Sequence, residues 1–197
     1  MTNLAAEFMR PAPLPSPPWS KAPVQDASSA AFASAIAPFR SDLKADYATA
    51  LADQALSSKH GRQSASNEAA QEAARSALEI GPNDSRLWLV LALLQAQSNP
   101  LDPRITESLK MSYLTGPSQA GLIPVRLDMA TSNNSLKDSE LRELAQGDVR
   151  AILTRYPDQR QTLLNDYVRA TATGKTFLEE SARTIDPKFA DSLQSAK

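Results

Sequence analysis

The residues of this chain that could do chemistry are few, and their spacing forms no complete catalytic arrangement. His60 is the only histidine and there is no cysteine, so a transition-metal site would lack its usual ligands. A serine–histidine–aspartate arrangement needs a histidine held between an exposed serine and an aspartate, whereas Gly61 places His60 in a predicted loop. We therefore expect no metal, no cofactor and no catalytic role at His60.

A second candidate is the tripeptide Gly174-Lys175-Thr176, which is similar to the end of a phosphate-binding loop. That loop requires a glycine five residues earlier and a preceding strand. The chain has Arg169 at the earlier position, within a segment predicted to be helical. We interpret the tripeptide as the start of a helix that Thr173 caps.

Neighbouring carboxylates form the third candidate group, at Glu179-Glu180 and at Glu140 with Glu143. General acid–base catalysis would need one of them in an apolar pocket that raises its pKa. Their sequence contexts predict solvated helix faces instead. The chain is therefore predicted not to be an enzyme. An α-helical enzyme whose residues converge only in three dimensions stays as an alternative.

The composition points to a globular chain without a strong charge preference. Of 197 residues, 42% are hydrophobic and 6 are glycine, and the net charge is −1 with acidic and basic residues interleaved. Nucleic-acid binding usually requires a basic excess on one face, so we expect no nucleic-acid partner. The longest apolar run, residues 87–94, is far shorter than the ~20 residues that span a bilayer. As written the chain is expected to be cytoplasmic, or periplasmic or envelope-associated if an N-terminal leader or anchor is missing.

The chain divides into a proline-rich beginning and a longer helical part. Six prolines precede residue 24, and repeated proline fixes φ and removes backbone donors. Residues 1–26 are therefore predicted to be a flexible N-terminal segment, with Pro15 and Pro18 as a PxxP recognition motif in an alternative reading. Residues 27–197 are predicted to form a single helical domain.

Stop and start signals of helices recur along that domain. Gly81-Pro82 and Gly116-Pro117 each predict a helix end, because glycine accepts a left-handed cap and proline cannot continue the helix. Asp84 and Asp102 are predicted helix caps, and no segment shows the sustained alternation of strands. We therefore predict an all-α fold of about seven to nine helices in stacked antiparallel hairpins. The better defined helices are expected over residues 41–58, 66–80, 85–97, 103–114 and 118–131.

The spacing of four prolines, at positions 82, 117, 157 and 187, is typical of helical-hairpin repeats, with intervals of 35, 40 and 30 residues. Around the first of them the chain resembles the junction of two tetratricopeptide repeats. In that family, small residues let two helices approach, proline ends the second helix, and tryptophan packs at the start of the next hairpin. The residues that carry the resemblance are Ala70, Ala74, Ala77, Leu78, Pro82, Trp88, Leu91 and Ala92. The other repeats are degenerate.

This resemblance implies a groove lined by the first helix of each hairpin, where the family binds peptides or proteins. The positions that it places there are Arg86, Leu89, Leu93, Gln97, Asp128, Thr131, Gln161, Leu164 and Val168. The variant of the family that grips a terminal carboxylate has lysine and asparagine where this chain has Leu89 and Leu93, so we expect no carboxylate gripping. In the competing interpretation, these two leucines are buried core of a compact bundle without a groove.

The resemblance implies a non-enzymatic interaction or scaffold module that binds a protein or peptide partner. Several bacterial proteins look similar, and some of them are thought to act at the cell envelope. A structural component of an envelope assembly, tethered through its N-terminus, is therefore a second hypothesis.

Overall fold

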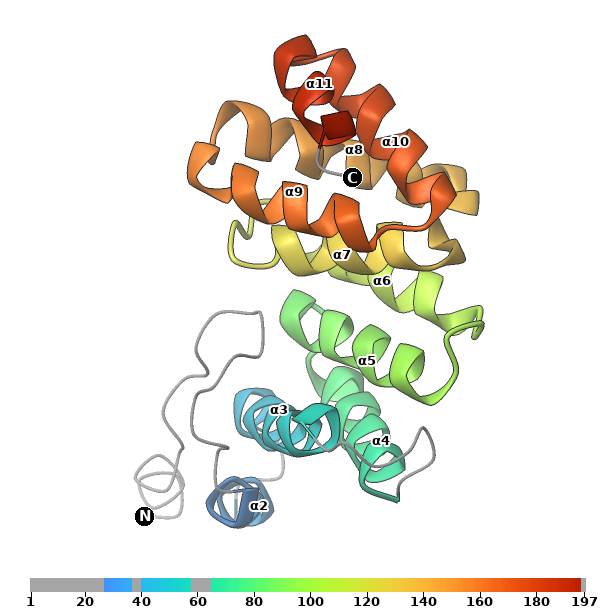
Figure 1. Cartoon of the computed structure of the whole chain (residues 1–197). Coiled ribbons are helices and arrows are strands. Elements are labelled where there is room, and N and C mark those ends of the chain that lie inside the picture. The colour runs from blue at the N-terminus through green and yellow to red at the C-terminus, as the bar shows by residue number, and fades with distance from the viewer. Residues whose placement is uncertain (1–26, 37–39, 58–64, 196–197) are drawn as a thin grey trace. The chain divides into compact units, whose positions relative to one another are not determined.

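The computed structural model describes residues 27–36, 40–57 and 65–195. The predicted proline-rich segment, its PxxP motif and His60 lie outside these residues. Within them there are ten α-helices, two 3-10 turns and no strand (Figure 1), so the all-α prediction is confirmed. The elements are α2 (Ala27–Ile36), α3 (Ser41–Ser57), α4 (Ala65–Ile80), α5 (Ser85–Ser98), α6 (Arg104–Thr115), α7 (Ile123–Ser132), η1 (Asn134–Lys137), α8 (Ser139–Thr154), η2 (Pro157–Gln159), α9 (Arg160–Arg169), α10 (Ala172–Arg183) and α11 (Pro187–Ser195).

Two compact units make up the chain, Met1–Pro117 with α2 to α6 and Ser118–Lys197 with α7 to α11. Each is described by itself below, and the assignment of one domain to residues 27–197 stays a prediction. The sequence signals did not indicate helix α2. The helix expected from residue 118 begins only at Ile123, with Pro124 in its first turn, where proline's fixed φ suits a helix start.

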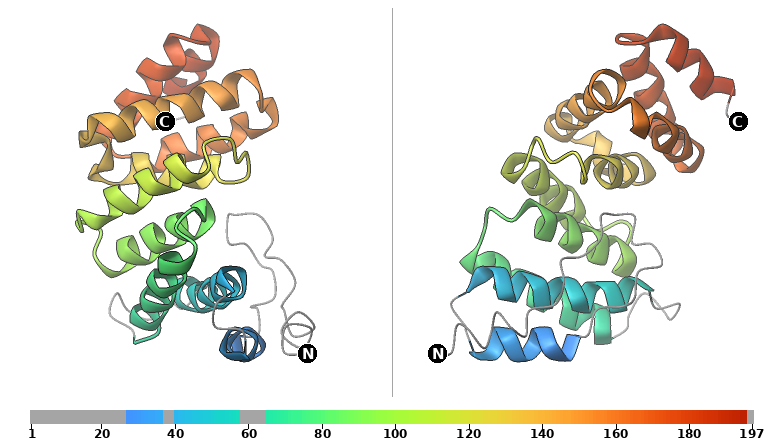
Figure 2. Two further views of the ribbon diagram at one scale, coloured as in Figure 1. Left: turned by 180° about the vertical axis from the view of Figure 1, so that it is seen from behind. Right: turned by 90° about the vertical axis from the view of Figure 1, so that its left-hand side faces the viewer.

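In the first unit, consecutive helices pack as hairpins. Helix α3 packs against α4, α5 packs against both of them, and α6 packs against α5. Helix α2 packs against α3 and runs alongside it (Figure 2). Helix α5 thus covers the apolar side chains that the α3/α4 hairpin leaves open.

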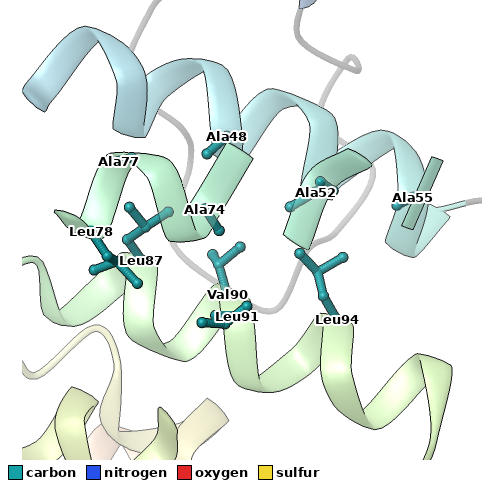
Figure 3. Packing of buried hydrophobic residues seen from close by; sticks show 11 residues of the cluster. Ala48, Ala52, Ala55, Ala74, Ala77, Leu78, Leu87, Val90, Leu91 and Leu94 are labelled. Carbon is teal, nitrogen blue, oxygen red and sulfur yellow. The ribbon is translucent and has the colours of Figure 1, made fainter. Parts of the chain in front are cut away.

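Small side chains line the contact between α3 and α4. Ala48, Ala52 and Ala55 on α3 face Ala74 and Ala77 on α4, and all five are essentially inaccessible to solvent (Figure 3). Alanine at these positions lets the two backbones approach closely. Four larger side chains of α5 complete the cluster, at Leu87, Val90, Leu91 and Leu94.

The junction between α4 and α5 is held by specific hydrogen bonds. The indole Nε1 of Trp88 donates to the carbonyl oxygen of Pro82 at 2.7 Å, which links the tryptophan to the proline of the repeat-like pattern. The predicted cap is confirmed, since the Asp84 carboxylate accepts from the backbone N–H of Leu87 at 3.0 Å. Trp88 is half-buried and packs against the alanine-rich cluster.

Glycine ends the two predicted helices, although for a different reason from the one expected. Gly116 has φ −154°, which is extended backbone, and Gly81 lies outside the left-handed region as well. The prediction of left-handed caps is therefore wrong. At Gly81 the absent side chain matters instead, because a Cβ there would lie 2.9 Å from the Cβ of Ser41 at the start of α3.

In the second unit, α7 packs against α8, α9 and α10, while α10 also packs against α8 and α11. Helix α8 carries apolar side chains at spacings of three and four residues, of which Leu141, Ala145, Val149, Ile152 and Leu153 are buried and Leu144 is half-buried. Other helices of the unit contribute buried side chains to the same apolar interior. Leu127, Leu163, Tyr167, Phe177, Leu178 and Leu193 are buried as well.

A tight joint connects α7 with the beginning of α10. The backbone N–H and the hydroxyl of Thr171 both donate to the carbonyl oxygen of Thr131, each at 3.0 Å. The Thr171 hydroxyl also accepts from the backbone N–H of Gly174 and so caps α10. The sequence predicted Thr173 as this cap, and that prediction is wrong, because the cap is Thr171. A Cβ on Gly174 would lie 2.2 Å from the Thr131 oxygen, so close packing explains the glycine of the Gly174-Lys175-Thr176 tripeptide.

Candidate interaction surface

The four partner-binding positions predicted on α5 differ in accessibility. Arg86 is exposed and Leu93 is half-buried, so both side chains reach the surface. Leu89 is only 1% exposed, which prevents its side chain from contacting a partner in this structure. Gln97 is half-buried, and its carboxamide has internal partners.

Gln97 links three helices through both ends of its carboxamide. Its Nε2 donates to the carbonyl oxygen of Ala55 near the end of α3 at 3.0 Å. Its Oε1 accepts from Nδ2 of Asn67, on the first turn of α4, at 2.6 Å. Asn67 is buried and donates to the carbonyl of Leu94 as well. The position predicted to meet a partner therefore ties α5 to the preceding hairpin.

This amide network continues along α4 toward the surface. Nε2 of Gln71 donates to Oδ1 of Asn67 at 2.6 Å, and Nη2 of Arg75 donates to Oε1 of Gln71 at 2.8 Å. Each amide therefore both donates and accepts. Because buried amides are costly without partners, the network fixes the register between α4 and α5.

The positions predicted in the second unit lie on α7 and α9, which pack against each other. Val168 is 57% exposed, Gln161 is exposed and Leu164 is half-buried. Thr131 is completely buried, and its hydroxyl donates to the carbonyl of Leu127. Thr131 thus supports the joint with Thr171 and presents no side-chain surface, while Asp128 keeps 37% of its side chain exposed.

Asp128 belongs to a group of three charged side chains that we call the Arg169 cluster, formed by Asp128, Asp166 and Arg169. Nε and Nη2 of Arg169 donate to Oδ1 of Asp128 at 3.1 and 3.0 Å. Nη2 also donates to Oδ1 of Asp166 at 2.7 Å. Arg169 is about half exposed whereas Asp166 is buried, so the guanidinium joins a surface carboxylate of α7 to an interior carboxylate of α9.

The environment of Asp166 favours its protonated form. Burial, and to a smaller extent the nearby Asp128 carboxylate, raise the pKa of its carboxyl group, Arg169 lowers it, and the net result is a pKa of about 7. A solute can reach Arg169 and Asp128, whose side chains are 54% and 37% exposed, but not Asp166, which is 1% exposed. The cluster is therefore suited to holding a charged group at the surface, with Asp166 setting the local charge from beneath.

Two of the carboxylates considered for catalysis have structural partners. The hydroxyl of Tyr167 donates to Oε1 of Glu179 at 2.5 Å. This hydrogen bond, with burial and the carboxylate's charge, raises the pKa of Tyr167 to about 12. Glu180 pairs with Arg142 at 2.8 Å. Glu179 and Glu180 therefore connect helices of the second unit.

Arg169 and Asp166 are not among the residues predicted from the sequence. Their spacing of three along a helix was visible as a local ion pair, but Asp128 lies 41 residues away from Arg169. Asn67, on the first turn of the alanine-rich helix α4, was missed too. Only the packing of α7 on α9 and of α4 on α5 brings these groups together.

Two further features are absent from the part of the chain that the structure describes. No grouping of three or more histidine, cysteine, aspartate or glutamate side chains there could hold a metal ion. None of the described helices is long and apolar enough to cross a bilayer.

Comparisons with protein families, with curated proteins and with solved structures found no match for this chain.

Proposed function

We propose that this chain is a non-enzymatic interaction module that binds a protein or peptide partner on the outward surface of its helical hairpins. The observation that carries the proposal is that helices from successive hairpins lie against each other within each unit, α3 with α5 and α7 with α9. Side chains from separate segments of the chain then share one surface. The resemblance of residues 70–92 to a tetratricopeptide-repeat junction supports the same function.

The accessible side chains favour binding on α5 and on the α7/α9 pair. Arg86 and Leu93 reach the surface on α5, and Asp128, Leu164 and Val168 do so on α7 and α9. Exposed apolar side chains beside charged ones are a common feature of partner-binding surfaces. Leu89, Gln97 and Thr131 support these helices from the inside.

The proposal is tested by immobilising the purified protein and identifying the proteins that it retains from a lysate of its source cells by mass spectrometry. Arg86→Glu and Asp128→Lys are each expected to reduce the retained partner at least tenfold while helicity stays unchanged. The melting temperature should stay unchanged in Arg86→Glu and fall only slightly in Asp128→Lys, which also loses the exposed ion pair with Arg169. Arg150→Glu on α8, an exposed charge reversal away from these positions, is the matched control. If both variants retain the same partner as the unmodified protein, the assigned surface is wrong. If nothing is retained specifically, the proposed function fails.

A further inference from the structure

We infer that the Arg169 cluster, together with Leu164 and Val168, is a docking site for a basic and aliphatic segment of a partner protein. The segment would place a lysine or arginine side chain on the Asp128 carboxylate and an aliphatic side chain on α9. This inference deepens the proposed function and rests on it, because it names the chemistry that one part of the surface recognises.

The charge count of the cluster favours a cation. Two carboxylates share one guanidinium, which leaves a surplus of one negative charge when both carboxylates are ionised. Both hydrogen bonds from Arg169 to Asp128 end on Oδ1, so Oδ2 of Asp128 is left as the acceptor for a further donor. The Asp128 side chain is 37% exposed, so a partner's cation can approach this carboxylate from solvent.

An orphaned buried atom points to the same shortage of positive charge. Oδ2 of Asp166 is buried and has no hydrogen-bond partner among the described residues. Such an atom is costly when the carboxylate is ionised. Burial and the nearby Asp128 carboxylate raise the pKa of Asp166 to about 7 against the opposing charge of Arg169, so a proton relieves part of this cost. A cation bound to Asp128 would stabilise the ionised form of Asp166 through its charge, without touching the buried oxygen.

Solvent-accessible apolar side chains lie on the same helix as Arg169, one helix side away from it. Val168 precedes Arg169 on α9 and is 57% exposed, and Leu164 lies one helical turn earlier on the same face. Aliphatic side chains at positions i and i+4 offer a continuous strip that a leucine or valine of a partner can cover. A segment carrying both charge and aliphatic surface fits better than a purely basic one.

Two charged groups of α10 beside α9 contact Tyr167 and not the Arg169 cluster. From α10, Glu179 accepts from the Tyr167 hydroxyl, and Nζ of Lys175 lies 5.3 Å from the centre of the Tyr167 ring. The charges that act on Asp166 are those of Asp128 from α7 and Arg169 from its own helix. Protonation of Asp166 removes the surplus negative charge, and a partner's cation should therefore bind more tightly above pH 7 than below it.

The test is a titration of the full-length, ¹⁵N-labelled protein with the peptide acetyl-LKLKL-amide, followed through the amide signals of Asp128 and Val168. At pH 8 these signals should shift to saturation, and at pH 6 the affinity should fall by roughly two- to fivefold, the usual size of one surface charge contact. Acetyl-LELEL-amide should cause no saturable shift. Acetyl-SKSKS-amide should bind more weakly than the leucine peptide.

Variants of the cluster separate this site from general attraction of cations. Asp128→Asn and Val168→Ser should each weaken the lysine–leucine peptide, and Asp166→Asn should abolish the change in affinity between pH 6 and pH 8. Asp191→Asn on α11, which also removes one exposed carboxylate, is the matched control and should change nothing. The inference is overturned if the glutamate peptide binds equally well, or if Asp128→Asn binds the lysine peptide like the unmodified protein. In that event, a lysate partner still lost in Arg86→Glu would leave the proposed function standing without this chemistry.

Discussion

At the scale of single residues, Gln97 shows how a polar side chain on a predicted binding face becomes part of the framework. Its carboxamide accepts from Asn67 and donates to the carbonyl of Ala55. A net contribution of about 1 kcal/mol is usual for one such bond, but a buried amide left without a partner costs about 1–3 kcal/mol. The network therefore contributes to the order of the three helices more than any one bond suggests.

Asn67→Ala and Gln97→Ala are each expected to reduce the free energy of unfolding by about 1–3 kcal/mol, because each leaves polar groups of its neighbours without a partner. The double variant should lose less than the sum, by roughly 0.5 kcal/mol or more, since the two side chains share one bond. Urea denaturation followed by circular dichroism measures all three values. Gln161→Ala, at an exposed position of α9, should change stability by less than about 0.5 kcal/mol. Strictly additive losses would contradict the network.

At the scale of helices, close approach depends on residues with little or no side chain. Alanines line the contact between α3 and α4 and let the two helices approach closely. Gly174 lets the first turn of α10 approach the Thr131 carbonyl at the end of α7. Gly147 is different, because a Cβ there would meet nothing within 4 Å and the residue lies exposed inside α8. The two glycines therefore differ in what a methyl group would do.

Gly174→Ala is expected to destabilise the protein by about 1–3 kcal/mol, because the new methyl group collides with backbone atoms that cannot move aside. Gly147→Ala should stabilise it by up to about 1 kcal/mol, since alanine favours a helix interior over glycine. Thermal unfolding of the two variants beside the unmodified protein measures both effects. A melting temperature for Gly174→Ala at or above that of the unmodified protein would show that α7 and α10 are not joined in this way.

At the scale of the whole molecule, the chain forms two compact units, and each has a buried apolar interior of its own. The first is built around the alanine-rich cluster of α3, α4 and α5. The second is built around the buried side chains of α7 to α11, including Leu141 and Phe177. Regions with separate cores often open with separate free energies.

Leu94→Ala, which removes a fully buried side chain of α5, should cost about 2–5 kcal/mol in the first unit. We expect hydrogen exchange measured by mass spectrometry to accelerate in α3, α4 and α5, while peptides from α8 and α10 keep their protection. Equal acceleration throughout the chain would instead indicate that the two units unfold as one.

Much of the fold was predictable from local signals. Asp84 caps α5 as expected, and the glycine–proline pairs end α4 and α6 at the predicted places. These features depend on neighbouring residues, and their physics is short-range. The cap at Thr171 and the late start of α7 at Ile123 were missed, because several residues in those loops could serve equally well and the packing selects one of them.

The sequence by itself determined an all-α chain, because the spacing of its apolar residues and its capping and stop signals act within a few residues of each other. The tertiary structure decided which candidate side chains are available. Leu89, Thr131 and Gln97 point inward or are bonded within the fold, whereas Arg86 and Val168 stay accessible. Only the packing of α7 on α9 brought Asp128 to Arg169, since burial and ion pairing across 41 residues depend on which helix faces meet.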